Sequence, residues 1–235
     1  MKRALLDALN DARVAKRRTA LITRLDDGDQ ALLVDGEIET GGLIAPADVL
    51  DAAEDALRAD KGRTVEAGDG RLYFVQIFNP PLRLLCIGAV HIAQALAPIA
   101  ELAGYEVTVI DPRGAWGTPE RFPGVTVDER WPDEALDALG PDRRTAICAL
   151  THDPKLDDPA LTRALRSEAF YVGALGSKKT HAKRVERLTE SGLTGEEIGR
   201  IAAPIGLDIG AVSPSEIAIS IMAQITLALR GPKGR

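Results

Sequence analysis

The spacing of hydrophobic residues changes about one third of the way along the chain. Before Asn79-Pro80-Pro81, segments with helical spacing alternate with β-rich segments, whereas short continuous apolar runs and amphipathic segments follow it. Two consecutive prolines continue neither a helix nor a central strand. The sequence therefore predicts a domain boundary here, with a small N-terminal α+β domain over 1–79 and a larger domain over 82–235.

The first domain contains two segments with helical spacing and three with strand character. Helices are predicted over 2–16 and 47–59. Strands are predicted over 19–25, 30–34 and 71–78, the first two joined by a turn at 26–28. A unit of about 80 residues lies near the lower size limit for independent stability.

The larger domain alternates strands with helices. Strands are predicted over 83–87, 106–110, 125–127, 145–150 and 170–172. Helices are predicted over 91–103, with an interruption at Pro98, and over 133–139, 159–166, 180–190 and 214–229. Continuous apolar strands separated by helices indicate a parallel sheet covered on both faces. The expected fold class is α/β, a Rossmann-like parallel sheet domain preceded by the small α+β domain.

Composition narrows the classes of partner. The chain has 235 residues and a formal net charge of -6, which argues against nucleic acid and anionic membranes, because proteins that bind them carry a basic face. No apolar run approaches the roughly 18–20 residues of a membrane span, and Asp7 comes too early for a secretory signal. Two cysteines imply no disulfide framework, so we expect a cytoplasmic protein. Both Cys86 and Cys148 lie in apolar strands and are interpreted as buried small hydrophobes.

Gly88 follows the first strand of the larger domain and precedes a helix, as in a dinucleotide-binding turn. It provides the tight turn, and Ala93 allows close packing of helix on sheet. Val90 replaces the glycine that lets a pyrophosphate approach, so NAD(P) is disfavoured. Asp111 ends the next strand, where an acid holds a ribose hydroxyl, and His91 faces either this crevice or solvent. The turn is thus structural, a dinucleotide site, or a site for another ligand.

Three further loops follow predicted strands, and open parallel sheets bind ligands at the carboxyl ends of their strands. The first contains His152, a residue that titrates near neutral pH, and Asp153. We favour both as ligand contacts. Asp157 and Asp158 are interpreted as turn and cap residues before a helix that starts at Pro159.

The second loop, 173–181, runs from a strand into a helix and combines two glycines with a serine and paired lysines. Backbone N–H groups and a helix N-terminus would suit a phosphate group. A capped helix with solvated lysines is the alternative. The candidate contacts are Gly173, Gly176, Ser177, Lys178, Lys179 and His181.

The third loop, 204–210, contains Asp208, which is either a ligand contact or a turn residue. After it, Ser213, Pro214 and Glu216 form the pattern of a capping box at the start of the last helix.

Four ordered motifs in these loops resemble the XdhC/CoxI family of xanthine dehydrogenase accessory proteins. The resemblance covers Leu82 to about Leu229. The motifs are Gly88-Ala89-Val90-His91; Leu150-Thr151-His152-Asp153 with Asp157-Asp158-Pro159-Ala160-Leu161; Phe170-Tyr171-Val172-Gly173-Ala174-Leu175-Gly176-Ser177 with Thr180-His181; and Pro204-Ile205-Gly206-Leu207-Asp208-Ile209-Gly210.

The resemblance implies a Rossmann-like domain with a role in enzyme maturation. Family members bind molybdenum cofactor (molybdopterin) transiently, protect it during sulfuration, and deliver it to the apo-enzyme of xanthine dehydrogenase or a related molybdenum hydroxylase. They are chaperones, so no catalytic residue is assigned. The implied partners are that apo-enzyme and a cysteine desulfurase, and we expect a homodimer. The expected cofactor contacts are Gly88, His91, Asp111, His152, Asp153, Gly173, Gly176, Ser177, Lys178, Lys179, His181 and Asp208.

The chain departs from the family pattern at two places. Val90 stands where the family usually has glycine, and Gly41-Gly42 is followed by Leu43 instead of cysteine, with no cysteine before Cys86. If those cysteines contact molybdenum in relatives, this chain does so differently. It is then a divergent paralogue, or it acts beside a second protein that carries the missing half.

Two other functions remain open. A nicotinamide-dependent oxidoreductase would need Val90 to be tolerated and a proton donor such as His152. A scaffold without cofactor would dock onto the dehydrogenase or a sulfurase through the small N-terminal domain.

Overall fold

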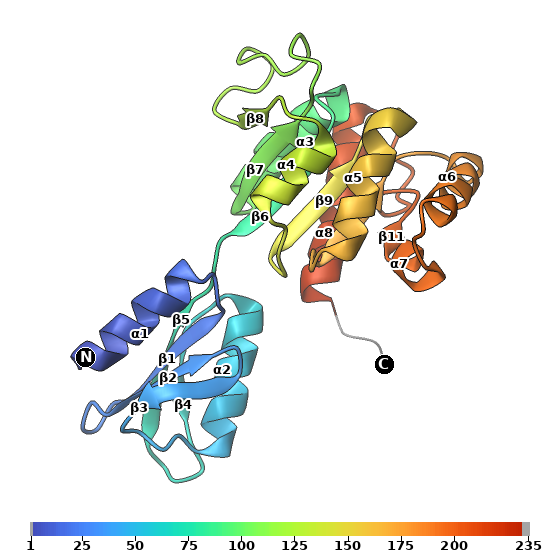
Figure 1. Cartoon of the computed structure of the whole chain (residues 1–235). Coiled ribbons are helices and arrows are strands. Elements are labelled where there is room, and N and C mark those ends of the chain that lie inside the picture. The colour runs from blue at the N-terminus through green and yellow to red at the C-terminus, as the bar shows by residue number, and fades with distance from the viewer. Residues whose placement is uncertain (1, 232–235) are drawn as a thin grey trace. The chain divides into compact units, whose positions relative to one another are not determined.

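The computed structural model of the chain describes residues 2–231 (Figure 1). The chain forms two compact units, one up to Pro80 and the other from Pro81 onward. The first strand of the second unit begins at Leu82, directly after the two prolines. Each unit has its own hydrophobic core.

The first unit is a five-stranded antiparallel sheet in the order β3-β2-β1-β5-β4, with one helix on each face. Leu5 and Leu9 of α1 pack against Leu21 and Leu32 on one face. The other face packs against α2, whose buried residues recur with helical spacing. The elements are α1 (Arg3–Val14), β1 (Thr19–Arg24), β2 (Gln30–Val34), β3 (Glu37–Gly41), α2 (Ala47–Ala59), β4 (Arg63–Glu66) and β5 (Leu72–Phe78).

The two strands at the edges of this sheet, β3 and β4, were not expected from the sequence. Each consists mostly of exposed residues and lacks the buried alternation that marks β1, β2 and β5. An edge strand pairs on one side only, so its hydrogen bonds carry it and its side chains need not be apolar.

The second unit contains six parallel strands in the order β11-β10-β9-β6-β7-β8. The strands are β6 (Leu82–Ile87), β7 (Tyr105–Ile110), β8 (Thr126–Asp128), β9 (Thr145–Ala149), β10 (Tyr171–Ala174) and β11 (Ile201–Ala202). The helices are α3 (His91–Leu102), α4 (Pro132–Leu139), α5 (Pro154–Arg166), α6 (Lys178–Glu190), α7 (Gly195–Gly199) and α8 (Pro214–Arg230). None of the helices within residues 2–231 combines the length and apolar character needed to cross a bilayer. The α/β fold class with a parallel sheet is confirmed.

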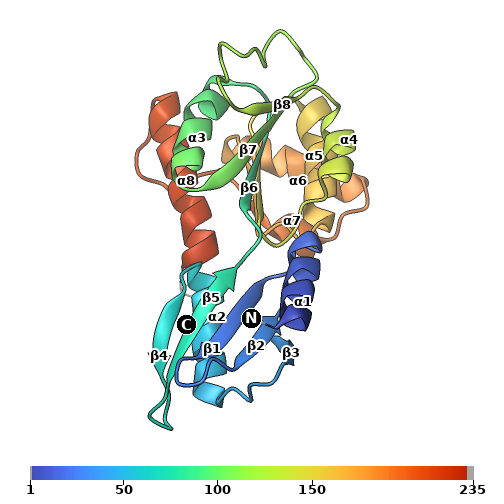
Figure 2. The same ribbon diagram turned by 90° about the vertical axis from the view of Figure 1, so that its left-hand side faces the viewer.

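Helices cover both faces of this sheet. Alternate residues of each strand point to opposite sides, so each strand contributes apolar side chains to both faces. Leu84 and Cys86 of β6 face α3 and α8, whereas Leu85 and Ile87 face α4 and α5. Figure 2 shows the two pairs of helices on opposite sides of the strands. The continuous apolar strands predicted from the sequence thus serve two separate core layers.

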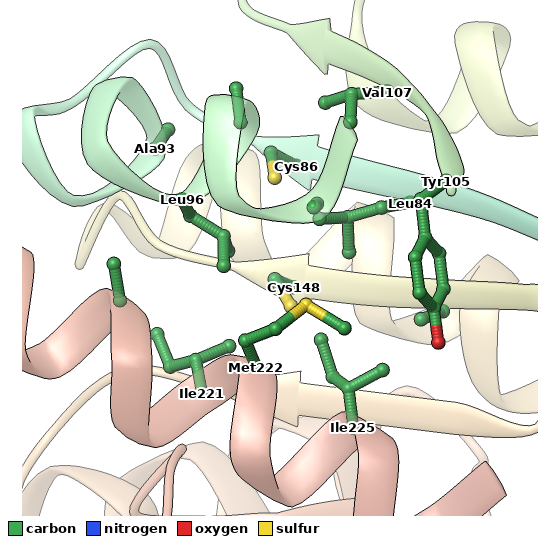
Figure 3. Close-up of a cluster of buried hydrophobic side chains, with 14 of the residues drawn as sticks. Leu84, Cys86, Ala93, Leu96, Tyr105, Val107, Cys148, Ile221, Met222 and Ile225 are labelled. Carbon is green, nitrogen blue, oxygen red and sulfur yellow. The ribbon is translucent and has the colours of Figure 1, made fainter. Parts of the chain in front are cut away.

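Cys86 and Cys148 are neighbours in register on β6 and β9 and are both completely buried. Figure 3 shows them in the layer beneath α3 and α8, with Met222 nearby. Burial raises the pKa of the Cys86 thiol to about 12, and burial together with Cys86 raises that of Cys148. The interpretation of both as small buried hydrophobes fits this environment.

Three helix predictions needed correction. The helix predicted to break at Pro98 continues through it as α3, with the proline ring on the exposed side. The helix predicted to begin at Pro159 begins one turn earlier, at Pro154. The helix predicted from Thr180 begins at Lys178, so both lysines lie in its first turn. The short elements α7 and β11 were not expected, since neither carries a hydrophobic period.

Candidate functional site

The sheet order reverses at β6, which has β7 on one side and β9 on the other. This is the point where open α/β sheets bind ligands, outside the carboxyl ends of the strands. The loops after β6 and β9 touch here. Gly88 has a φ of +104°, and a Cβ at this position would collide with the Cγ2 atom of Thr151. Gly88 is therefore required both for its backbone conformation and for the close approach of the neighbouring loop.

Asp111, at the end of β7, is completely buried and fully engaged by its own chain. Its carboxylate accepts hydrogen bonds from the backbone N–H of Ala89 at 2.8 Å and from the side chain of Arg113 at 2.8–2.9 Å. Burial alone would raise the pKa of Asp111, but these donors outweigh burial and lower it. These oxygens tie the turn after β6 to β7, and the expected contact of Asp111 with a ribose hydroxyl stays a prediction.

The first residues of α3 leave the turn after β6 without an obvious ligand group. Val90 occupies the N-cap position of α3 with an extended backbone, and its side chain packs against the core below the helix. His91 is exposed. The half of the edge built by β6 and β7 thus presents few free polar groups.

The loop after β9 is organised by two residues. Asp153 is the N-cap of α5, and its carboxylate accepts a hydrogen bond from the N–H of Lys155 at 3.0 Å. The cap expected at Asp158 is therefore wrong by five residues. His152 is exposed and has a φ of +62°, a left-handed conformation that is uncommon outside glycine. Such strain persists where the surrounding structure enforces it and is frequent at binding sites.

The loop after β10 is shorter than expected. Gly173 lies inside β10 and is buried, so it is not a loop residue; a Cβ there would meet Ile205 and the hydroxyl of Tyr171 at 2.6 Å. Gly176 has a φ of +138° and forms the turn itself. Ser177 is the N-cap of α6 and accepts from the N–H of Thr180 at 3.2 Å. The glycine and serine positions thus shape the turn that presents the lysines.

A buried ion pair, not expected from the sequence, lies beneath these two loops. Asp157 of α5 and Arg184 of α6 approach to 3.5 Å, and each side chain is only 2% exposed. The Thr151 hydroxyl donates to Asp157 at 2.7 Å, and Arg184 donates to the carbonyl of Leu175 at 2.8 Å. Burial raises the pKa of Asp157 and lowers that of Arg184. The pair connects the loops after β9 and β10 to each other.

An open cleft of about 360 Å³ lies between the start of α5 and the side of α6. His152 and Pro154 form one wall. The other wall is formed by Lys179, Thr180, Lys183, Arg184 and Arg187 of α6. Arg187 is paired with Asp158 of α5 at 2.5 Å. The structure thus brings two expected residues, His152 and Lys179, into one cleft with three basic residues that the sequence analysis did not select.

The remaining candidates do not line this cleft. Ser177 and Lys178 are exposed beside it. His181 is half-buried, with Nδ1 lacking a hydrogen-bond partner among the described residues; burial and the nearby charge of Arg184 lower its pKa. Asp208 is exposed in the loop between β11 and α8. Within residues 2–231, no group of three or more His, Cys, Asp or Glu side chains is placed to hold a metal ion.

Some of the cleft residues that the sequence analysis did not select could have been recognised from their spacing in the sequence. Lys179, Lys183 and Arg187 recur at intervals of four residues, which places them on one stripe of a helix. Asp157 and Arg184 had none, because their partnership depends on the packing of α5 against α6.

The family model for the XdhC Rossmann domain matches residues 84–225, more than half of the chain. The chain belongs to the XdhC family. The matched range includes most of β6, the turn at Gly88, the buried Asp157–Arg184 pair and most of α8. The resemblance noted from the four sequence motifs is confirmed.

Three curated relatives of this XdhC-family chain are each 32% identical to it over the aligned residues. They include the uncharacterized protein YqeB of Escherichia coli (strain K12), 32% identical over 68% of this chain and 30% of the relative. The molybdenum cofactor insertion chaperone PaoD of the same organism is 32% identical over 63% of this chain and 40% of its own length. A protein of Bacillus subtilis (strain 168), named as a probable xanthine dehydrogenase subunit, is 32% identical over 65% and 44%. The chain thus spans less than half the length of these relatives.

A solved structure extends the likeness to both units. The crystal structure of a xanthine dehydrogenase from Bacillus halodurans superposes with a TM-score of 0.71 and 25% identity, covering 97% of this chain and 67% of that one. The fold of the small antiparallel unit therefore recurs in that protein together with the Rossmann domain.

Proposed function

We propose that this chain binds molybdenum cofactor transiently and assists the maturation of a molybdenum hydroxylase such as xanthine dehydrogenase. The observation that carries the proposal is membership of the XdhC family together with the likeness to a relative named as a molybdenum cofactor insertion chaperone. The cofactor is then cargo, and the chain acts as a chaperone without chemistry of its own.

The carboxyl edge of the parallel sheet supports this proposal through its charge. The cofactor carries an anionic phosphate, and the cleft beside α6 contains four basic side chains. Lys179, Lys183 and Arg184 would hold the phosphate, while His152 would lie against the rest of the molecule. Gly88 and Asp208 lie in other loops of the same edge and are further candidate contacts.

Metal contact through sulfur does not fit this chain. Cys86 and Cys148 are the two cysteines of the sequence, and both are sealed in the core with raised pKa values. A thiol in that state neither ionises nor reaches a ligand at the sheet edge. We infer that the cargo is held by its organic part, and that any sulfur ligand to molybdenum comes from the cargo itself or from a partner protein.

The geometry does not favour NAD(P) in its usual pose. That pose needs a glycine where Val90 stands and a free acid where Asp111 is engaged by Ala89 and Arg113. A nicotinamide-dependent activity is accordingly the alternative that the test below must distinguish.

Partners follow from the proposal. A delivery chaperone must contact the apo-enzyme, and sulfuration of the metal requires a sulfur donor such as a cysteine desulfurase. A homodimer is the expected state of the chain itself.

The experiment is purification from cells that make the cofactor, followed by acid release and measurement of fluorescent pterin, and by titration of the pterin-free protein with NADPH and NADH. Stoichiometric pterin is expected. Tight dinucleotide binding without pterin would replace the proposal with an oxidoreductase. Neither ligand would leave a scaffold that docks onto the apo-enzyme, which co-purification with the hydroxylase would reveal.

A further inference from the structure

The cleft between α5 and α6 holds more positive charge than its surroundings compensate. Lys179, Lys183 and Arg187 follow one another at intervals of four along α6, with Arg184 beside them. Like charges at this spacing repel and weaken a helix. Asp158 pairs with Arg187 and Asp157 with Arg184, but neither lysine forms an ion pair with another described residue. Two full positive charges therefore remain in the cleft.

Arg184 adds an independent observation. Its side chain is only 2% exposed, it lines the cleft, and its Nε and Nη1 atoms have no hydrogen-bond partner within residues 2–231. Buried polar groups in native proteins are nearly always hydrogen-bonded, and an unsatisfied buried guanidinium is costly. The Oδ2 atom of Asp157, which forms the ion pair at 3.5 Å, accepts no hydrogen bond from a described residue. Arg184 thus lines the cleft while two of its buried nitrogens lack an acceptor among the described residues.

The lining defines the ligand by charge. The residues lining the cleft include no carboxylate, so the cleft does not suit a cation. They also include no Phe, Tyr or Trp ring on which a base or pterin could stack. The N-terminus of α5, at Pro154, borders the cleft and adds partial positive charge. Lysines bind phosphate as point charges, and an arginine fork binds it through two parallel hydrogen bonds.

We propose that the α5–α6 cleft is a phosphate or diphosphate site in which Arg184 and the lysines at 179 and 183 hold the anion. This deepens the proposed function and rests on it for the identity of the natural ligand, because the cofactor phosphate is one such group. It moves the anion from the turn over 173–179 to the side of α6. Lys179 belongs to the site, whereas its neighbour Lys178 does not.

The test is calorimetric titration of the full chain with inorganic pyrophosphate at low, fixed ionic strength. We expect saturable one-site binding to the wild type. The double variant K179A/K183A should weaken it at least tenfold. The matched control K155A/K178A removes the same charge from two exposed lysines outside the cleft and should change the affinity less than twofold. Absence of saturable binding, or equal losses in the two double variants, would overturn the site.

Arg184 is tested with R184K, which keeps the charge opposite Asp157 but loses the planar fork. Affinity should fall at least threefold while the thermal midpoint shows that the chain still folds; unchanged affinity in folded R184K would remove Arg184 from the site. The outcomes separate from those of the proposed function. Pterin carried equally by wild type and K179A/K183A overturns the cleft and leaves the chaperone, whereas pyrophosphate binding without pterin does the reverse.

Discussion

The two halves of the parallel sheet share one architecture but differ in how their buried charged residues are hydrogen-bonded. In the half built from β6 and β7, Asp111 is buried, and its carboxylate accepts hydrogen bonds from the N–H of Ala89 and from the backbone and side chain of Arg113. In the half built from β9 and β10, Arg184 is also buried and lines a cleft, but two of its nitrogens have no hydrogen-bond partner among the described residues. Both halves place loops and helix N-termini at one edge. The difference teaches that the fold alone does not locate a ligand, because two halves with the same architecture differ in which buried polar atoms lack a partner.

The largest effect is expected at the buried pair that supports the second half. Asp157→Asn removes the charge opposite Arg184 and should lower the free energy of unfolding by about 3 kcal/mol, because an uncompensated buried charge remains. Asp158→Asn is the matched control. Its partner Arg187 is 36% exposed, so the cost should stay below about 1 kcal/mol. Urea denaturation followed by tryptophan fluorescence measures both, since Trp116 and Trp131 lie in this unit. Similar costs for both variants would contradict the distinction.

The closed half of the edge should be sensitive to its central acid. Asp111→Asn weakens the hydrogen bonds that hold the turn after β6 and should cost about 2 kcal/mol, the range for a hydrogen bond to a charged group. Because the folded state keeps this carboxylate ionised, its contribution is complete above the ordinary Asp pKa of 3.8 and is lost as the pH falls below that value toward the lowered pKa. Unfolding experiments at pH 7 and pH 3 measure the difference. A wild-type advantage as large at pH 3 as at pH 7 would show that ionisation is not the cause.

The role of Asp153 is expected to be smaller and local. Asp153→Ala removes the N-cap of α5 and should cost about 1 kcal/mol, whereas Asp153→Ser retains a capping oxygen and should restore most of it. Thermal or urea unfolding ranks the three proteins. If both variants lose pterin while Asp153→Ser keeps full stability, the carboxylate also contacts the cargo, and the division between capping and binding residues must be redrawn.

The smallest effect concerns His181, which borders Arg184. Burial and that charge lower its pKa from 6.5, so the folded state favours the neutral ring. Its stabilising contribution is present above pH 6.5 and declines as the pH falls below it toward the lowered pKa. His181→Gln should therefore flatten the stability profile between pH 7 and pH 5. Parallel profiles for wild type and His181→Gln would place the histidine outside this electrostatic environment.

Much of the fold follows from hydrophobic spacing, and the errors have local causes. The strands β1, β2 and β6 and the helix α2 match their predictions within one residue, since each buries a regular set of side chains. The start of α5 was ambiguous because Asp153-Pro154 and Asp158-Pro159 are both good start signals. Packing decides between them: Leu156 and Asp157 are buried, and only the earlier start makes them helical.

The candidate site was predictable at the level of loops but not of contacts. The motifs at Gly88, His152 and Gly176 do lie at one sheet edge, as the topology of a parallel sheet requires. Which oxygen or nitrogen remains free depends on neighbours distant in sequence: Ala89 is 22 residues from Asp111, and Arg184 lies 27 residues after Asp157. The sequence does not show whether a charged side chain such as Asp111 or Arg184 already has hydrogen-bond partners in its own chain. The structure shows that Asp111 has them and that two nitrogens of Arg184 do not.

The two buried thiols of the larger unit can report how often its core opens. Cys86 and Cys148 lie side by side under α3 and α8, and a thiol reagent reaches them only after that layer separates from the sheet. The rate at which they are labelled in native buffer therefore reports the frequency of that opening event. Ligands that hold the carboxyl edge together should slow the labelling in proportion to their occupancy. The labelling rate of these two native cysteines thus measures local opening without any engineered residue.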